Sequence, residues 1–406
     1  MRLSTMRRID YWVGVPACFL LSLPLRILGS RWGRRSPGTR PRVLFIELSE
    51  MGSTILAASS IARVIEDADE ARPCFVIFKK NVPSLALLEL FDEDDIHTIR
   101  DTSLVAMLVD IFKFMAFCHR KRIGSALDLE LFSRVSAMLS MLSGARQRVG
   151  FDNYLAEGLY RGPHLTHRVH YNPYQHMSRN FLALVEGLDR DPREQPGPKH
   201  VIPEADAPPR APRREAEYAY VRAELEQRVT LAEHTRIVIL NADAGKLLPI
   251  RTWPAERFAA VAEGVLEDPD VVVVLMGVPE DADTAEVIVK RVQSERCVSF
   301  VGCTRTLQDV IQLFHMSALL ITNDSGPAHF ATLTDIKVIT LFGPETARLY
   351  GPRGENAVNI DKQLACSPCL TAFNHRNSPC TDNQCLKAIT SEEVLGVARS
   401  LLNPSS

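Results

Sequence analysis

Residues 318–329 read ALLITNDSGPAH, and they predict a buried strand that runs through a glycine turn into a short helix. The first backbone N–H groups of a helix have no partner inside it, and the helix dipole adds partial positive charge there. We therefore expect an anion site around Asp324, Ser325 and Gly326, to which Ser325 adds a hydroxyl and His329 a ring. The alternative is an ordinary Asp-Ser-Gly turn whose serine caps the helix.

Apolar strand-like runs alternate with helical patterns on both sides of this stretch. Such alternation predicts a parallel sheet covered by helices on both faces. Because the alternation occurs twice, we predict an α/β protein with two Rossmann-like, doubly wound domains facing across a cleft, with ligands beyond the carboxyl ends of the strands. The expected strands are 43–48, 74–78, 126–129 and 148–151 in the first domain, and 236–240, 271–276, 298–301, 318–322 and 337–342 in the second.

A proline-rich segment separates the two alternating regions. Seven prolines lie between residues 190 and 215, which excludes a regular helix or a central strand there. We interpret residues 190–216 as a linker, with one domain at 41–189 and the other at 217–406.

The N-terminal 40 residues contain an apolar run with arginines on both sides. Residues 11–25 carry no charge, but the run is interrupted by Gly14, Pro16 and Pro24 and is shorter than the ~20 residues that span a bilayer. A segment of this kind suits the surface of an anionic membrane. With no cleavable secretory signal, we expect a cytoplasmic protein whose residues 1–40 contact the inner face of the cytoplasmic membrane. The alternative is a helix packed on the protein's own body.

Composition gives little sign of a nucleic-acid partner or of a catalytic metal. The net charge is −2, so no basic surface is indicated. Four of the nine cysteines, Cys366, Cys369, Cys380 and Cys385, cluster near the C-terminus with spacing that suits a structural zinc ion. The alternative is that they serve the local structure without metal.

Several short motifs occur in an order that resembles glycosyltransferase family 9, whose best-known members are the ADP-heptose:lipopolysaccharide heptosyltransferases. The resemblance runs from about residue 42 to the C-terminal helix. The motifs are LSEMG at 48–52, NA at 241–242, RTWP at 251–254, GVPE at 277–280, GCT at 302–304, TNDSGPAH at 322–329 and LFGP at 341–344.

The resemblance implies a GT-B fold and an inverting, metal-independent glycosyltransferase that requires no cofactor. Its donor would be a nucleoside-diphosphate sugar such as ADP-heptose, held mainly by the C-terminal domain. Its acceptor would be a lipopolysaccharide or another lipid-linked cell-envelope glycan, held mainly by the N-terminal domain.

Donor binding requires positive charge and hydrogen-bond donors around the leaving diphosphate. Arg251 matches the family's basic residue before Trp-Pro, and Lys246 is a second candidate. The alternative for Arg251 is a solvent-exposed residue before a helix. Thr322, Asn323 and Glu280 are expected to line the nucleoside pocket.

The first glycine loop departs from the family pattern at the proposed catalytic base. The family carries Gly-Asp in this loop, whereas here Gly52 is followed by Ser53. A serine hydroxyl does not take up a proton at neutral pH without a partner. We expect Glu50, in the same loop, to be the base, with Ser53 beside it. Glu47, in the first strand, is the other carboxylate that could replace the missing one. The alternative is that Glu50 only caps the following helix.

Other polar residues of the N-terminal domain are candidates for acceptor binding. Asp128 and Glu130 follow another predicted strand and could also face the cleft. His167 and His170 belong to a polar, aromatic tract. With Gly52, these four residues form the expected acceptor site.

Two other functions remain open from the sequence. Because Ser53 replaces the family's aspartate, the chain could be a catalytically impaired nucleotide-sugar-binding regulator or scaffold. A sugar-nucleotide epimerase of similar two-domain build is the third hypothesis.

Overall fold

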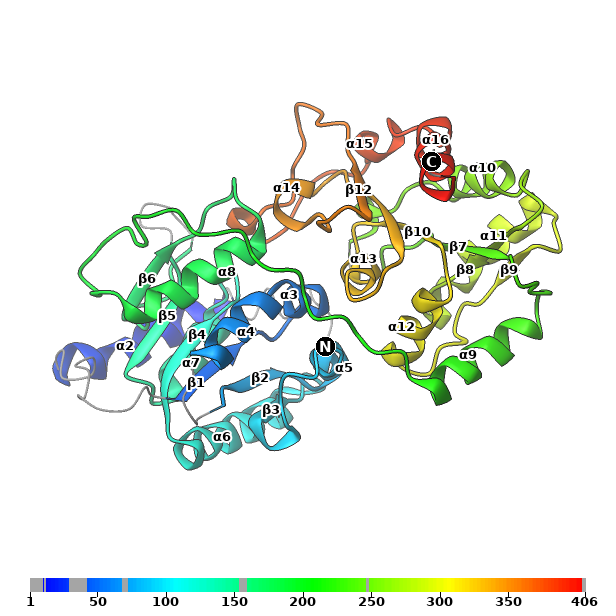
Figure 1. Ribbon diagram of the computed structural model, residues 1–406. Helices are drawn as coiled ribbons and strands as arrows, with labels where there is room; N and C mark the ends of the chain where they lie inside the picture. The colour runs from blue at the N-terminus through cyan, green and yellow to red at the C-terminus, as the bar shows by residue number, and fades with distance from the viewer. Residues whose placement is uncertain are drawn as a thin grey trace. The chain divides into compact units, whose positions relative to one another are not determined.

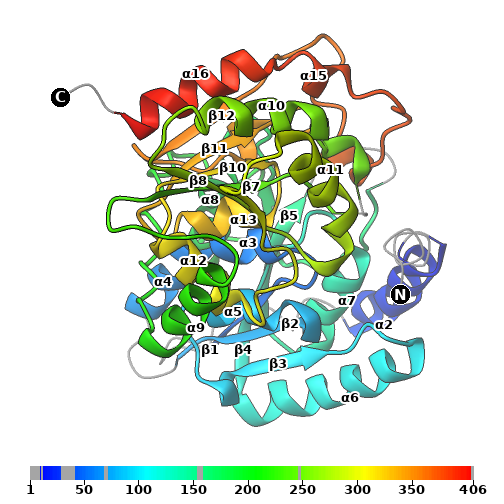
Figure 2. The same ribbon diagram turned by 90° about the vertical axis from the view of Figure 1, so that its right-hand side faces the viewer.

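A computed structural model of the chain describes residues 10, 12–28, 42–67, 72–152, 159–245 and 248–403. The chain forms two compact units, Met1–Asp206 and Ala207–Ser406. Each unit contains a six-stranded parallel sheet, and Figures 1 and 2 show helices on both faces of each sheet. The division between the units falls within the proline-rich segment 190–216.

The sheet of the N-terminal unit has the order β3-β2-β1-β4-β5-β6. The chain steps outward from β1 to β3 and then crosses to β4, so the carboxyl ends of β1 and β4 are neighbours where the order reverses. Its strands are β1 (Arg42–Ile46), β2 (Cys74–Phe78), β3 (Ile96–Ile99), β4 (Ile123–Asp128), β5 (Gln147–Asp152) and β6 (His167–His170). Its helices are α2 (Gly14–Leu28), α3 (Met51–Leu56), α4 (Ala58–Glu66), α5 (Val82–Ala86), α6 (Leu104–Lys121), α7 (Arg134–Leu142) and α8 (Met177–Glu186).

The C-terminal unit repeats this winding, in the order β12-β11-β10-β7-β8-β9. Its strands are β7 (Arg236–Asn241), β8 (Val271–Leu275), β9 (Cys297–Ser299), β10 (Leu319–Asn323), β11 (Lys337–Leu341) and β12 (Ala357–Ile360). Its helices are α9 (Glu215–Glu226), α10 (Ala255–Val265), α11 (Ala282–Val292), α12 (Leu307–His315), α13 (Gly326–Ala331), α14 (Ala347–Tyr350), α15 (Gln384–Lys387) and α16 (Ser391–Leu402).

The central strands are buried on both faces because helices cover both sides of each sheet. All five residues of β8, VVVVL, are buried, as are all five of β2, CFVIF. In the C-terminal unit the largest buried side chain is Trp253, whose ring packs edge-on against Phe258 with centroids 4.9 Å apart. Its indole N–H donates to the Ile389 carbonyl at 3.1 Å. The segment just before α10 is thereby fixed to the core.

The proline-rich segment is tied to each unit at a different point. On the N-terminal side, Arg179 donates to the Ile202 carbonyl at 2.6 Å and to Glu204 at 2.8 Å. On the C-terminal side, the Ala211 N–H donates to the Leu333 carbonyl at 2.8 Å.

Helix α2 lies on the N-terminal unit, against α7. Cys18 and Ser22 are buried, whereas Trp12, Val13 and Leu20 are exposed. Asp10 makes a 3.0 Å ion pair with the buried Arg134. The apolar run therefore has one face on the protein body and another face open. None of the helices within the described ranges is long and apolar enough to cross a membrane.

Candidate functional site

The carboxyl edge of the C-terminal sheet gathers polar side chains from β7 and β10. The Asn241 side-chain amide donates to Thr322 Oγ1 at 2.9 Å and to Ser325 Oγ at 3.2 Å. Thr322 is fully buried, and its hydroxyl lies 3.2 Å from the Ser325 hydroxyl, so it helps to hold Ser325 in place. Ser325 occupies the N-cap position of α13, but its hydroxyl does not cap the helix and contacts Thr322 and Asn323 instead.

Two asparagines fix the segment that carries Arg251. Asn323, at the end of β10, accepts the Trp253 backbone N–H at 2.9 Å. Asn383 lies in the cysteine-bearing tail and donates to the Ile250 carbonyl at 3.0 Å and the Thr252 carbonyl at 2.9 Å. The backbone on both sides of Arg251 is therefore held by side chains from distant parts of the sequence.

Arg251 and Asp324 form an ion pair at this edge, with Nη1 3.4 Å from Oδ2. Both side chains are largely buried. Burial raises the pKa of Asp324, and the positive charge of Arg251 opposes that rise. Arg251 Nε is also buried and has no hydrogen-bond partner among the described residues. The guanidinium therefore keeps a donor available for a ligand.

His329, on α13, is the second buried group with an unused polar atom. It is only 7% exposed, and its Nδ1 has no hydrogen-bond partner within the described part of the chain. Burial, followed by the positive charge of Arg251, lowers its pKa from 6.5 to about 4. At neutral pH the ring is therefore uncharged, and it can offer one donor and one acceptor.

Glu345 is a buried carboxyl of the same cluster that we did not expect from the sequence. It follows the LFGP motif, and Arg376 Nε lies 3.2 Å from its Oε1. Neither of its oxygens accepts a well-formed hydrogen bond within the described ranges. Burial and the nearby Asp324 raise its pKa well above 4.5, against the effects of Arg251 and the Thr346 backbone. The place of Glu345 directly after the LFGP motif is the only feature of the sequence that could have identified it.

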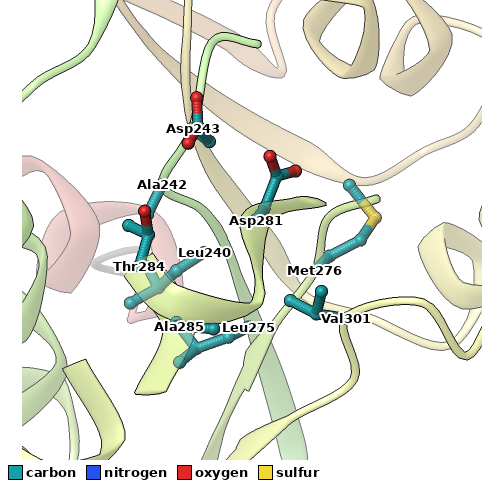
Figure 3. Close-up of a pocket in the computed structure, with 9 residues that line it drawn as sticks. All are labelled: Leu240, Ala242, Asp243, Leu275, Met276, Asp281, Thr284, Ala285 and Val301. Carbon is teal, nitrogen blue, oxygen red and sulfur yellow. The ribbon is translucent and has the colours of Figure 1, made fainter. Parts of the chain in front are cut away.

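A pocket lies beside this cluster, at the carboxyl ends of β7 and β8 (Figure 3). Apolar side chains, including Leu240 and Leu275, form one side of it. Figure 3 shows the carboxylates of Asp243 and Asp281 on the other side. The remaining lining residues are Ala242, Met276, Thr284, Ala285 and Val301.

Thr322, Asn323 and Glu280, the residues expected to line a nucleoside pocket, are not among the residues that line this one. Thr322 is buried beside Ser325, Asn323 bonds to the Trp253 backbone, and Glu280 is exposed on the short 3₁₀ helix Pro279–Asp281. Lys246, the second basic candidate, lies outside the described residues.

In the N-terminal unit, Glu50 and Ser53 are neighbours at the carboxyl end of β1. The Ser53 hydroxyl donates to Glu50 Oε2 at 3.2 Å. Glu50 is the N-cap residue of α3, yet its side chain makes no capping hydrogen bond. Gly52 lies within α3 and is half-buried. A carboxylate and a hydroxyl are thus paired at a sheet edge, which is an arrangement suited to accepting a proton.

Glu130 and Asp128, at the end of β4, have structural partners. Glu130 Oε1 accepts the backbone N–H groups of Leu48 and Ser49, both at 2.8 Å, so it ties the end of β1 to the end of β4. Asp128 is fully buried, paired with Arg161 and hydrogen-bonded to Ser136 at 3.0 Å. Burial raises the pKa of both carboxyl groups.

The two histidines expected at the acceptor site lie on the edge strand β6. His167 is buried, and its Nδ1 is 2.8 Å from Thr166 Oγ1, whereas His170 is exposed. The structure therefore brings Glu50, Ser53 and Gly52 together and places the two histidines on a strand separated from β1 by β4 and β5.

All nine cysteines are free thiols. Within the described ranges, no three His, Cys, Asp or Glu side chains are grouped closely enough to hold a metal ion. In the cysteine-bearing tail, the Ser378 hydroxyl donates to Cys369 Sγ at 3.2 Å. Asn383 of the same tail supports the Arg251 segment through its two hydrogen bonds.

Sequence comparison relates more than half of the chain to one protein family. Residues 127–378 match the profile of Glycosyltransferase family 9 (heptosyltransferase). A segment of 157 residues is 29% identical to lipooligosaccharide heptosyltransferase 2 of Campylobacter jejuni, covering 38% of this chain and 48% of the relative. The chain thus spans about half the length of the curated relatives it matches.

Structural comparison supports the fold over most of the chain. The glycosyl transferase family 9 structure from Veillonella parvula superposes with a TM-score of 0.69 at 19% identity, covering 90% of this chain and 98% of that one. The Escherichia coli ADP-heptose LPS heptosyltransferase II gives 0.64 at 20% identity, with 89% and 98% covered. The predicted α/β class, with two Rossmann-like domains of the GT-B type, is confirmed.

Proposed function

The chain belongs to glycosyltransferase family 9, and from this premise we propose that it moves a sugar from a nucleoside-diphosphate donor to a cell-envelope glycan. The match over residues 127–378 carries the proposal, because it includes the DSGPAH turn, Arg251 and His329. The donor class that best fits the relatives' names is ADP-heptose, and the acceptor class is lipopolysaccharide or lipooligosaccharide.

The donor binds to the C-terminal unit in this proposal. Its diphosphate lies against Arg251, Ser325, Gly326 and His329. Arg251 Nε and His329 Nδ1 are buried there with no hydrogen-bond partner among the described residues. The donor's nucleoside lies over the ends of β7 and β8, where the carboxylate of Asp243 or Asp281 can accept hydrogen bonds from ribose hydroxyls. An uncharged His329 can donate to the diphosphate, while Arg251 supplies the positive charge that stabilises it.

The transfer is an inverting displacement that needs a base but no metal. An acceptor hydroxyl attacks the anomeric carbon, the bond from that carbon to the diphosphate oxygen breaks, and the nucleoside diphosphate leaves with the electron pair. Glu50 takes the hydroxyl proton, and Ser53 orients the Glu50 carboxylate through the 3.2 Å hydrogen bond. Glu130 supports Glu50 through the loop that it holds at Leu48 and Ser49.

The protein works in the cytoplasm at the inner membrane surface in this proposal. The exposed side of α2, with Phe19 and Leu20, contacts the membrane that carries the acceptor lipid, together with Trp12 and Val13 just before the helix. Its other side, with the buried Cys18 and the nearby Asp10–Arg134 ion pair, keeps the helix on the N-terminal unit.

Donor turnover by the wild-type chain and by Glu50→Gln tests the function. We expect the wild type to release ADP from ADP-heptose in the presence of a heptose-deficient lipopolysaccharide. We expect Glu50→Gln to lower kcat by about 10²- to 10⁴-fold with little change in ADP affinity. Glu66→Gln, on α4, is the matched control. Donor binding without turnover in the wild type would favour the scaffold function instead.

A further inference from the structure

Helix α6 carries apolar side chains on two opposite faces. Its inner face contributes Phe114, Phe117 and Cys118 to the core of the N-terminal unit. Its outer face exposes large apolar side chains, with Val105 73% and Phe112 72% exposed. The full exposed set is Leu104, Val105, Leu108, Val109, Phe112 and Met115.

The exposed set forms one continuous stripe. Residues three and four apart lie on the same side of a helix, and the six positions follow this spacing along most of α6. Single exposed apolar residues are ordinary on a soluble protein, but six neighbouring exposed apolar side chains on one helix face indicate an interaction site. The stripe therefore requires a partner that accepts an apolar helix face.

The charges of α6 indicate the nature of that partner. Lys113, His119 and Arg120 are exposed on the helix, and Arg122 is exposed at its C-cap. Asp110 is the only acidic residue of α6. It is buried and paired with Arg100 through contacts of 2.8 Å at both carboxylate oxygens. The exposed face of α6 thus combines apolar and basic side chains without an acidic one.

We propose that the outer face of α6 lies flat in the surface of an anionic lipid membrane. Apolar side chains would enter the boundary between headgroups and acyl chains, and the lysine and arginines would meet the anionic headgroups. A second copy of the chain fits less well, because a symmetric contact between two α6 faces would bring like charges together. The helix is not apolar enough to cross the bilayer, in keeping with an in-plane position.

The position of α2 also supports a membrane on this side of the N-terminal unit. Helix α2 packs on α7, and α7 shares with α6 the core beneath one face of the sheet. Figures 1 and 2 both draw α2 and α6 on this side of the N-terminal unit. Helix α6 would thus be a second lipid-facing helix beside α2. Its membrane contact does not depend on which sugar the protein transfers.

Vesicle binding by the full chain tests the proposal. Sedimentation with phosphatidylglycerol–phosphatidylcholine vesicles is compared with phosphatidylcholine vesicles alone. We expect the double variant Val105→Ser and Phe112→Ser to bind the anionic vesicles at least about tenfold more weakly than the wild type. The double variant Lys113→Glu and Arg120→Glu is expected to bind more weakly and to lose most of the salt dependence.

Matched variants separate α6 from general surface effects. Tyr174→Ser with Val201→Ser removes two apolar side chains that are equally exposed on the same unit, and Lys199→Glu changes charge away from α6. These variants should bind vesicles like the wild type. Melting temperature and ADP affinity should stay the same in every variant, because all substituted side chains are exposed.

Three results would overturn the proposal. The first is vesicle binding that the α6 variants leave unchanged. The second is an equal loss in the Tyr174 and Val201 variant. The third is self-association of the wild type, without vesicles, that the Val105 and Phe112 variant abolishes. Sugar transfer is measured separately, so failure of one proposal leaves the other in place.

Discussion

Arg251 Nη1 lies 3.4 Å from Asp324 Oδ2, longer than the roughly 2.7–2.9 Å of a strong charge-assisted hydrogen bond. Arg251 Nε has no hydrogen-bond partner within the described ranges. The pair therefore holds the guanidinium in place without using all of its donors, and the remaining donors are the ones assigned to the diphosphate in the proposed function. Asp324 keeps the cation at this edge of the sheet.

Arg251→Gln tests this relationship. Removing the charge should weaken ADP binding by roughly 10- to 100-fold, corresponding to one or two hydrogen bonds to a charged group. Titration calorimetry with ADP measures the change. Arg291→Gln, at a half-exposed position on α11 of the same unit, should leave ADP binding unchanged. Equal affinities for the wild type and Arg251→Gln would remove Arg251 from the donor site.

Asn383→Ala tests whether the tail positions Arg251. The variant loses both hydrogen bonds to the Ile250 and Thr252 carbonyls, so the Arg251 segment gains freedom that ADP binding must remove. We expect about a tenfold loss of ADP affinity, measured by calorimetry. The exposed neighbour Gln384 provides the control, since Gln384→Ala should bind ADP normally. If both variants bind like the wild type, the tail has no influence on this site.

A carboxylate at position 53 should rescue the loss of Glu50. Ser53 Oγ is 3.2 Å from Glu50 Oε2, so an aspartate there would place its carboxylate near the same point. The double variant Glu50→Gln with Ser53→Asp should recover at least about tenfold in kcat over Glu50→Gln alone. Ser53→Ala in the Glu50→Gln background is the control and should give no recovery. Steady-state kinetics with ADP-heptose decides between these outcomes.

His329 should make the folded state sensitive to acid. Its pKa is about 4 in the folded chain, against 6.5 ordinarily. Below pH 6.5 the unfolded chain takes up the proton first, so stability is full above that pH and falls as pH drops towards about 4. His329→Gln should remove roughly 3 kcal/mol of this loss. Urea unfolding of both proteins between pH 7 and pH 4 measures the difference.

The control for the acid prediction is His234→Gln, since His234 is a mostly exposed histidine of the same unit. Its stability profile should follow that of the wild type. A wild-type profile parallel to that of His329→Gln at every pH would show that the ring is not held neutral by the fold.

The sequence predicted the central strands well and the edge strands poorly. The run VVVVL at β8 predicts a buried strand, because a strand with helices over both faces of its sheet is apolar at every position. By contrast β3, β6 and β12 read IHTI, HRVH and AVNI, and these polar edge strands lack an apolar run. The sequence pattern therefore does not reveal that His167 and His170 lie on a strand, and their role in acceptor binding stays a prediction.

Parts of the site depend on tertiary contacts that spacing does not reveal. The DSGPAH turn was recognisable because its residues are consecutive. Glu345 and Arg376 meet through the fold, and neither stands out in the sequence. Asp128 was a candidate acceptor residue, but its partner Arg161 comes from the loop before β6. Local patterns identified the turn, whereas the partners of buried charges required the structure.

The anchoring of the proline-rich segment sets limits on domain motion. Arg179 fixes the backbone at Ile202 and reaches Glu204, and Leu333 fixes it again at Ala211. Any swivelling between the units must then be concentrated in the few residues between these points. Two of them, Pro208 and Pro209, have their φ angles locked by the ring. The connection should therefore act as a short, stiff hinge with few rotatable bonds, not as a loose tether.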